Sequence, residues 1–308
     1  MNVLQRTVGL AVVALATTVV LQGQGAVSGV FFSEGWESGS AAGSFNSAGF
    51  GNAAGLNTQF FLQNGNAGGG TWSLQHRLTA GQDPDSVAYA TQHFGDAISG
   101  PVWPTGAGQH FFDIYVQYKI YYSPGFQFDA HGLKMLELGT QDNYDQTGVC
   151  CNPWVANYTT LYVTANGAPA LEGNNKGAAT PEWIGYPQNA SGYTGSNPLR
   201  LQPGRWYTIE VRRRLNDAGA DNGILQLWVD GVLVVDYRNA RVRSPRVGAY
   251  GANYAYGTNW VMISDYPHFA VPQSQSVSYD DVKISTTPIG SGVASAPPRP
   301  PTNVRLVR

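Results

Sequence analysis

The sequence predicts an all-β protein folded as a sandwich of two antiparallel sheets. Short segments with apolar residues at alternate positions recur along the chain, and glycine, proline or asparagine bounds each of them. No stretch keeps a helical period, and no internal repeat is present. Only 12% of the 308 residues are charged, whereas 38 are glycine and 17 are tyrosine. This composition is typical of strands joined by wide loops rather than of a disordered chain.

The first half of the predicted sandwich begins at Phe31. Residues 31–39 carry two phenylalanines and a tryptophan and predict the opening strand. Small and polar residues dominate 40–70, which predict long loops around one short strand at 58–62. Strands at 72–79 and 87–94 follow, before a turn at Gly100-Pro101. The clearest strand of the chain is 112–122, where apolar residues occupy every second position.

The second half adds six predicted strands. Those at 133–138 and 159–164 precede a segment at 166–198 that is rich in glycine, proline and asparagine. A connection of that length in a compact domain is usually a functional loop or a lid. Alternation at 206–211 and 224–229, on either side of a polar turn, predicts a hairpin. Asp230-Gly231 then makes a tight turn into 232–235, and 277–285 predicts the last strand.

The chain divides into a leader, one domain and a tail. Residues 1–29 predict a secretory signal peptide, because Arg6 precedes an uncharged apolar run at 8–21 and a small, polar exit. An uncleaved anchor is the alternative. Residues 30–289 predict the sandwich domain, and 290–308 a proline-rich linker or tail. We therefore expect a secreted, extracellular or periplasmic monomer that leaves the membrane once the signal is cleaved.

Charge and cysteine content narrow the functions further. A net charge of −2 argues against a general nucleic-acid binder, and it means that any attraction to acidic polysaccharides must be local. The two cysteines, Cys150 and Cys151, are adjacent. They can bond to each other, bond to another chain or stay free, and we predict a vicinal disulfide that shapes one loop.

Two predicted strands carry tyrosines that suit a glycan-binding face. Along 113–122 one face is apolar, and the other presents Tyr115, Gln117, Lys119 and Tyr121. Tyr158, Thr160 and Tyr162 repeat this composition on a later strand. Aromatic rings stack on the C–H faces of sugars, while amides and cations bind hydroxyls and carboxylates. An ordinary solvated sheet face is the alternative interpretation.

Two segments carry a resemblance to a known family. The order of Trp206-Tyr207, a charged strand, an asparagine-containing turn and Trp228-Val229-Asp230-Gly231 resembles the concanavalin A-like jelly roll of lectins, laminin-G-like modules, glucanases and polysaccharide lyases. Residues 115–138 look like the part of alginate and glucuronan lyases that leads through an aromatic loop to Gly-x-Lys, here Gly132-Leu133-Lys134. The lyases' Lys-Leu-Pro-Gly is replaced by Lys134-Met135-Leu136-Glu137, and their Phe-Gly-Gly segment is absent.

The resemblance implies a lyase that cleaves a uronic-acid polymer by β-elimination. A cation or amide neutralises the C6 carboxylate, a base removes the C5 proton, and an acid protonates the leaving oxygen. Lys134 is the candidate for the first role or for the base, and His131 is the next candidate base. Tyr115 and Tyr121 are candidate acids. The candidate substrate-binding residues are Gln117, Lys119, Tyr158, Tyr162 and Arg77. His76 and Arg77 point to opposite faces of their strand, so only one can reach a cleft.

Other functions remain open. A non-catalytic carbohydrate-binding protein would keep the aromatic face without a base. A glycoside hydrolase ranks third, because hydrolysis needs two carboxylates facing one bond and the sequence shows no such pattern, Glu137 and Asp142 being the nearest. No cofactor is expected. Four carboxylates, Glu34, Glu37, Asp280 and Asp281, are weak candidates for a structural Ca²⁺, although a charged strand edge is the favoured interpretation.

Overall fold

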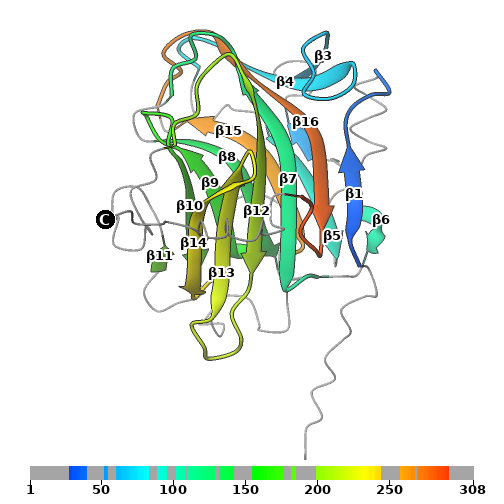
Figure 1. The fold of residues 1–308 in the computed structure, drawn as a ribbon, viewed down its shortest axis with the longest axis vertical. Coiled ribbons are helices and arrows are strands. Elements are labelled where there is room, and N and C mark those ends of the chain that lie inside the picture. The colour runs from blue at the N-terminus through cyan, green and yellow to red at the C-terminus, as the bar shows by residue number, and fades with distance from the viewer. Residues whose placement is uncertain are drawn as a thin grey trace, which may run out of the picture.

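The computed structural model describes twelve segments of the chain: residues 28–39, 52–54, 60–82, 89–95, 102–107, 110–128, 132–141, 155–175, 182–184, 199–243, 257–267 and 269–290. These segments form strands β1 to β16 and contain no helix, so none of them could supply a membrane-spanning helix. The strands make two sheets that face each other across one core (Figure 1). The predicted all-β sandwich is therefore confirmed.

The first sheet has the order β14-β13-β12-β7-β16-β4-β3, and β1 also pairs with β16. The described strands of this sheet all pair antiparallel. Its strands are β1 (Val30–Glu34), β3 (Phe60–Asn64), β4 (Trp72–Leu78), β7 (Asp113–Tyr122), β12 (Trp206–Arg214), β13 (Gly223–Val229), β14 (Val232–Ala240) and β16 (Gln275–Ser285).

The second sheet has the order β11-β10-β9-β8-β15-β5-β2, and β6 pairs with β5 in parallel. Its strands are β2 (Asn52–Ala54), β5 (Tyr89–Gly95), β6 (Val102–Ala107), β8 (Leu133–Gln141), β9 (Val155–Val163), β10 (Pro169–Asn175), β11 (Glu182–Ile184) and β15 (Trp260–Pro267). Each sheet thus joins strands that are far apart in the sequence.

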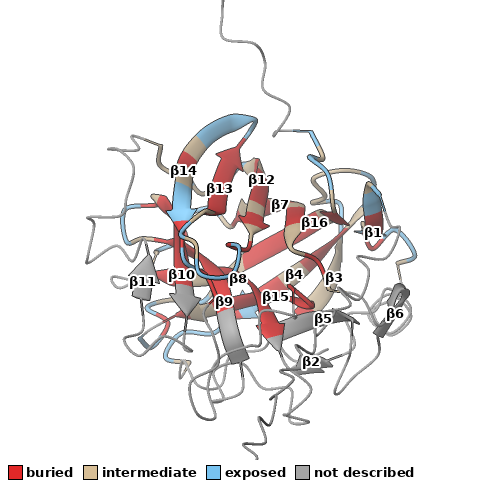
Figure 2. Ribbon diagram, turned by 90° about the horizontal axis from the view of Figure 1, so that it is seen from below, coloured by how far each residue is buried: buried red, intermediate tan, exposed pale blue. Residues whose placement is uncertain are grey.

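The core lies between the two sheets, where the buried strands face one another (Figure 2). As the alternation on β7 predicts, Ile114, Val116, Tyr118, Ile120 and Tyr122 point inward and are all buried. Removing such side chains from water is the main source of stability, at about 25 cal/mol per Å² of apolar surface. The residues between them on β7 consequently face outward, away from the second sheet.

A buried polar contact links the two sheets inside the core. The Nδ1 atom of His76 on β4 lies 2.6 Å from Oδ2 of Asp265 on β15. Tyr279 donates its hydroxyl to the other oxygen of Asp265, and the ring of Phe60 stacks on His76 at 4.4 Å. Burial, followed by the charge of Asp265, raises the pKa of Tyr279 well above its ordinary value. His76 is therefore a structural residue of the core.

Several parts of the second sheet differ from the sequence prediction, which did not include β2 and β6. The segment 166–198, predicted as a long connection, contains β10 and the short β11. The sequence pattern also predicts no strand at Trp260–Pro267, which is β15. Both strands owe their structure to long-range pairing, β10 with β9 and β15 with β8, and such pairing overrides weak local propensity.

Candidate functional site

The outer face of the second sheet carries a cluster of ionisable and hydroxyl side chains, which we call the lysine cluster. Register aligns Lys134 on β8 with Tyr162 on β9, and Tyr162 with Ala170 on β10. One row further along, Glu137 on β8 and Glu172 on β10 both pair with Thr160. The lysine cluster consists of Lys134, Glu137, Thr160, Tyr162 and Glu172. Since paired residues of adjacent strands point to the same face, these side chains share one surface.

A bulge in β8 explains why Lys134 and Glu137 lie on the same face. The register with β9 shifts between Lys134 and Leu136, so Met135 is an additional residue and is fully buried. Residues three apart would otherwise point to opposite faces of a strand. Gly132, at φ 96°, leads the chain into β8, and a Cβ there would lie 3.4 Å from Cδ1 of Tyr162. The glycine therefore allows the backbone to run close beside the tyrosine ring.

Electrostatic contacts join the members of the cluster. The Nζ atom of Lys134 lies 3.5 Å from Oε1 of Glu137, and their side chains are 13% and 1% exposed. The same ammonium lies 5.2 Å from the centre of the Tyr266 ring. Burial raises the pKa of Tyr162 far above its ordinary value, and the charge of nearby Glu172 raises it further. The Tyr162 phenol is thus protonated at neutral pH and is a hydrogen-bond donor.

Aromatic and apolar side chains extend this surface along the sheet. Tyr158, Trp260 and Met262 form a buried cluster that is separate from the main core. Tyr158 and Trp260 both pair with Gly139, so they flank β8. Tyr158 and Tyr162 are only 5% and 2% exposed, unlike the open tyrosine face expected from the sequence. Of the predicted site residues, the structure brings Lys134, Tyr158 and Tyr162 together here.

Five other predicted site residues lie on the first sheet, in the part of the chain that the structure describes. Tyr115, Gln117, Lys119 and Tyr121 all belong to β7, and Arg77 belongs to β4. The first sheet and the core separate them from the lysine cluster. The predicted combination of Lys134 with Tyr115 or Tyr121 at one reacting bond is therefore incompatible with the fold. Arg77 lies over the ring of Phe61, at 4.1 Å, and its neighbour His76 is in the core, so neither reaches the lysine cluster.

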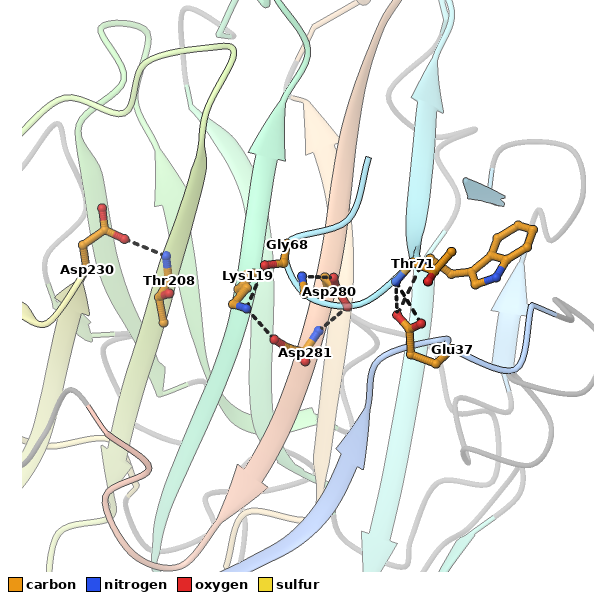
Figure 3. A network of polar contacts seen from close by, with 10 residues as sticks. Glu37, Gly68, Thr71, Lys119, Thr208, Asp230, Asp280 and Asp281 are labelled. Atoms are coloured by element: carbon orange, nitrogen blue, oxygen red, sulfur yellow. Dashed lines mark hydrogen bonds and ion pairs between the residues drawn. The ribbon is translucent and has the colours of Figure 1, made fainter. Parts of the chain in front are cut away.

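Contacts within the first sheet account for its polar residues. Gln117 donates to Glu210 at 2.9 Å, and Tyr121 packs against Trp206 at 5.4 Å between ring centres. Lys119 forms an ion pair with Asp281 at 2.6 Å and donates to the carbonyl of Gly68 at 2.9 Å (Figure 3). A Cβ on Gly68 would lie 2.8 Å from the Lys119 side chain, so this loop rests directly on the sheet. The chain covers this part of the face itself.

The carboxylates proposed for Ca²⁺ lie beside that loop. Asp280 accepts from the backbone of Gly69 at 2.8 Å and of Asp281 at 2.7 Å. Glu37 accepts from the backbone of Thr71 (Figure 3). Glu34 accepts from the backbone of Trp36. Across the described segments no group of three or more His, Cys, Asp or Glu residues is arranged to hold a metal. Backbone hydrogen bonds and the Lys119 ion pair are the partners that the structure gives these carboxylates.

Several predictions fall outside the described residues. They concern His131, the pair Cys150 and Cys151, most of the leader and the tail from residue 291. Conversely, sequence reasoning missed Glu172, which lies in the segment predicted as a loop. It placed Thr160 on the glycan-binding face and considered Glu137 for hydrolysis, but it listed neither among the lyase site residues. The spacing Tyr162-x₉-Glu172 carries no recognisable motif, so only the pairing of β10 with β9 could reveal this neighbour.

Comparison with known proteins finds similar structures but no similar sequence. No family model matches the chain, and no curated protein matches its sequence. The PL-14 alginate lyase of Aplysia kurodai superposes with a TM-score of 0.59 and 13% identity, over 83% of this chain and 98% of that one. Alginate lyase Aly36B follows with a TM-score of 0.53 and 17% identity, over 84% and 97%. For lyase vAL-1 from Chlorella virus the values are 0.51 and 11%, over 78% and 96%.

The chain has the fold of these alginate lyases. The predicted resemblance to jelly-roll polysaccharide lyases is thereby confirmed for the fold. At 11–17% identity the similarity does not carry residue roles across, so the chemistry of this protein has to be argued from its own side chains. One of the similar structures is an Aly36B variant, with a lysine and a tyrosine changed to alanine, in complex with an alginate tetrasaccharide.

Proposed function

We propose that this protein is a polysaccharide lyase that cleaves a uronic-acid-containing polymer by β-elimination at the lysine cluster. The observation that carries the proposal is the direct pairing of Lys134 with Tyr162 on one outer face, within a fold shared with alginate lyases. That pairing joins a cation and a proton donor, two of the three groups that an elimination at a uronate needs. Secretion through the leader at 1–29 is part of the same proposal, since polymers of this kind lie outside the cell.

Lys134 serves as the electrophilic group. The Lys134 side chain is 13% exposed, and its ammonium binds the C6 carboxylate of the uronate. Neutralising that carboxylate makes the C5 proton more acidic and stabilises the negative charge that develops when the proton leaves. Glu137, 3.5 Å from the ammonium, holds it in position on the sheet.

Tyr162 serves as the general acid. Its phenol is protonated at neutral pH and lies in register with Lys134, where it can give a proton to the glycosidic oxygen as the C4–O bond breaks. This assignment replaces Tyr115 and Tyr121, which lie on the first sheet. The assignment of His131 as a base stays a prediction.

The test uses the mature protein with alginate, glucuronan and heparin-type chains. A lyase generates unsaturated ends that absorb in the ultraviolet, and we expect this absorbance to rise on one of the three polymers. Tyr162→Phe should abolish the rise, whereas Tyr237→Phe, on the first-sheet edge strand β14, should leave it unchanged. A wild-type protein that produces no unsaturated ends from any of these polymers would refute the proposal.

One observation favours hydrolysis as a second candidate. Glu137 and Glu172 are both buried and lie two strand spacings apart, on either side of Thr160. Strands are separated by about 4.8 Å, so their Cα atoms are about 10 Å apart, a separation from which the carboxyl groups can bracket a glycosidic bond. New reducing ends without ultraviolet absorbance would select this function. Binding to the same polymers without either product would select a carbohydrate-binding protein.

A further inference from the structure

A row of aromatic and polar side chains crosses the outer face of the first sheet, with the core between it and the lysine cluster. Successive register pairs join Phe61 with Gln75, Gln75 with Ser278, Ser278 with Tyr121 and Tyr121 with Trp206. Paired residues of adjacent strands point to the same face, so these side chains form one row, which we call the aromatic row. It runs over β3, β4, β16, β7 and β12, and at about 4.8 Å between strands it is about 19 Å long.

The aromatic row faces solvent. The residues beside its members in the sequence belong to the core, for example Phe60, Tyr122 and Tyr207. Because successive side chains of a strand point to opposite faces, the row itself points outward. Four of its five members are half-buried, and the fifth, Ser278, is buried. Ring surface is therefore accessible along the row at Phe61, Tyr121 and Trp206.

One end of the row is an aromatic platform beside a loop. The rings of Tyr121 and Trp206 pack with their centres 5.4 Å apart. A Cβ on Gly68 would lie 3.0 Å from Cε3 of Trp206, so the loop that rests on Lys119 borders this platform (Figure 3). Rings that are held by each other and by a loop lose little conformational freedom when a ligand stacks on them, which favours binding.

The other end of the row carries an arginine. The guanidinium of Arg77 lies 4.1 Å from the centre of the Phe61 ring and donates to the amide oxygen of Gln75 at 2.8 Å. Arg77 is exposed, and neither of these two partners is charged. A planar guanidinium can donate two parallel hydrogen bonds to a carboxylate, so this one is oriented for an acidic ligand. The ligand that complements the row therefore has both apolar faces and carboxylates.

We propose that the aromatic row is a second polysaccharide-binding site, which holds a segment of a uronic-acid polymer without cleaving it. The rings stack on the C–H faces of the sugars, and Arg77 binds a carboxylate. The Gln75 amide donates one N–H to Gln63 at 2.6 Å and the other to a sugar hydroxyl. The inference goes beyond the proposed function, which uses the opposite face. Two sites that bind the same polymer raise its effective concentration at the lysine cluster.

The experiment measures how far native gels that contain alginate, glucuronan or dextran, a neutral glucan, retard the protein. The background is Lys134→Ala with Glu137→Gln, which removes the cation of the lysine cluster, so the polymer stays intact and binding reports on the row. At least one acidic polymer should still retard this background, and dextran should retard it less. Adding Trp206→Ala or Arg77→Ala should weaken binding about 10-fold or more, as the loss of an anchoring side chain does.

Matched controls are Phe269→Ala and Arg238→Ala, which remove an exposed ring and an exposed guanidinium outside the row and should leave binding unchanged. Melting curves check folding, and Arg77→Ala, at an exposed position, keeps the test valid if Trp206→Ala does not fold. A background that no acidic polymer retards, or unchanged binding in Arg77→Ala, overturns the second site. Stronger retardation by dextran overturns the acidic ligand. None of these results depends on unsaturated ends, so a wild type that cleaves no polymer refutes the lyase proposal alone.

Discussion

Replacing Lys134 by alanine tests the central residue of the proposed site. The change removes the cation that we propose binds the uronate carboxylate, and it leaves the strand register intact. Losing one preorganised group that stabilises developing negative charge typically costs about 100- to 1,000-fold in kcat. We therefore expect Lys134→Ala to lower turnover by at least about 100-fold, measured as the initial rate of ultraviolet absorbance increase.

The same change also affects stability, and its magnitude follows from the structure. Two unit charges at about 4 Å interact by about 4 kcal/mol at an effective dielectric constant of 20. The Lys134 and Glu137 charges are 3.5 Å apart, and Glu137 is almost completely buried. Removing one member of a buried pair typically costs 3–5 kcal/mol, and the 13% exposure of Lys134 places this case near the lower end, at about 3 kcal/mol.

A double variant separates the two effects. In Lys134→Ala with Glu137→Gln the buried negative charge is gone as well, so unfolding in urea should recover most of the lost stability. Turnover should stay low, because the carboxylate-binding cation is still missing. The reasoning is wrong if Lys134→Ala keeps turnover near that of wild type, or if the double variant regains activity together with stability.

Three further predictions follow from the described contacts. Gly132→Ala should lower stability by about 1–3 kcal/mol, because φ is 96°. It should also lower turnover, because the new Cβ lies 3.4 Å from Tyr162. The control Gly125→Ala, at φ 75° with no atom within 4 Å of its Cβ, should keep turnover unchanged. Asp265→Asn should destabilise the fold by about 1–3 kcal/mol in urea, since an amide has one acceptor oxygen in place of the two that contact His76 and Tyr279, and an unchanged free energy of unfolding would contradict that view. Burial raises the pKa of Glu34 and of Asp280 above their ordinary values of 4.5 and 3.8, so the folded state binds these protons more tightly than the unfolded state does. The stabilisation from these two carboxyl groups is present at pH values below their ordinary pKa values and is lost as the pH rises through their raised pKa values. Urea unfolding of Glu34→Gln should therefore show a smaller loss of unfolding free energy between pH 3 and pH 7 than wild type does. An equal loss in the two proteins would argue against the effect.

Local alternation in the sequence was sufficient to predict most strands and their inward faces. On β7 the apolar set from Ile114 to Tyr122 is buried as expected, and β4, β12, β13 and β16 begin or end within two or three residues of the predicted limits. These features depend only on the period of two along a strand and on turn residues at its ends. They are properties of neighbouring residues, so one sequence suffices.

The grouping of the candidate site residues could not be predicted in this way. Tyr115 and Tyr158 both alternate with apolar residues, and the sequence treats them as equivalent. The structure places Tyr115 on the first sheet and Tyr158 on the second, with the core between them. A sandwich has two outer faces, and the pattern within a strand is the same whichever sheet the strand joins.

The sequence by itself determined the all-β class and the resemblance to jelly-roll lyases, and it singled out Lys134 as a candidate site residue. Only the tertiary structure showed that Lys134, Tyr162 and Glu172 share one face, because that depends on β8, β9 and β10 lying side by side. Strand order is decided by hydrogen bonds and core packing between segments far apart in the chain. Neither these hydrogen bonds nor this packing changes the local alternation of residues, which is what a single sequence shows.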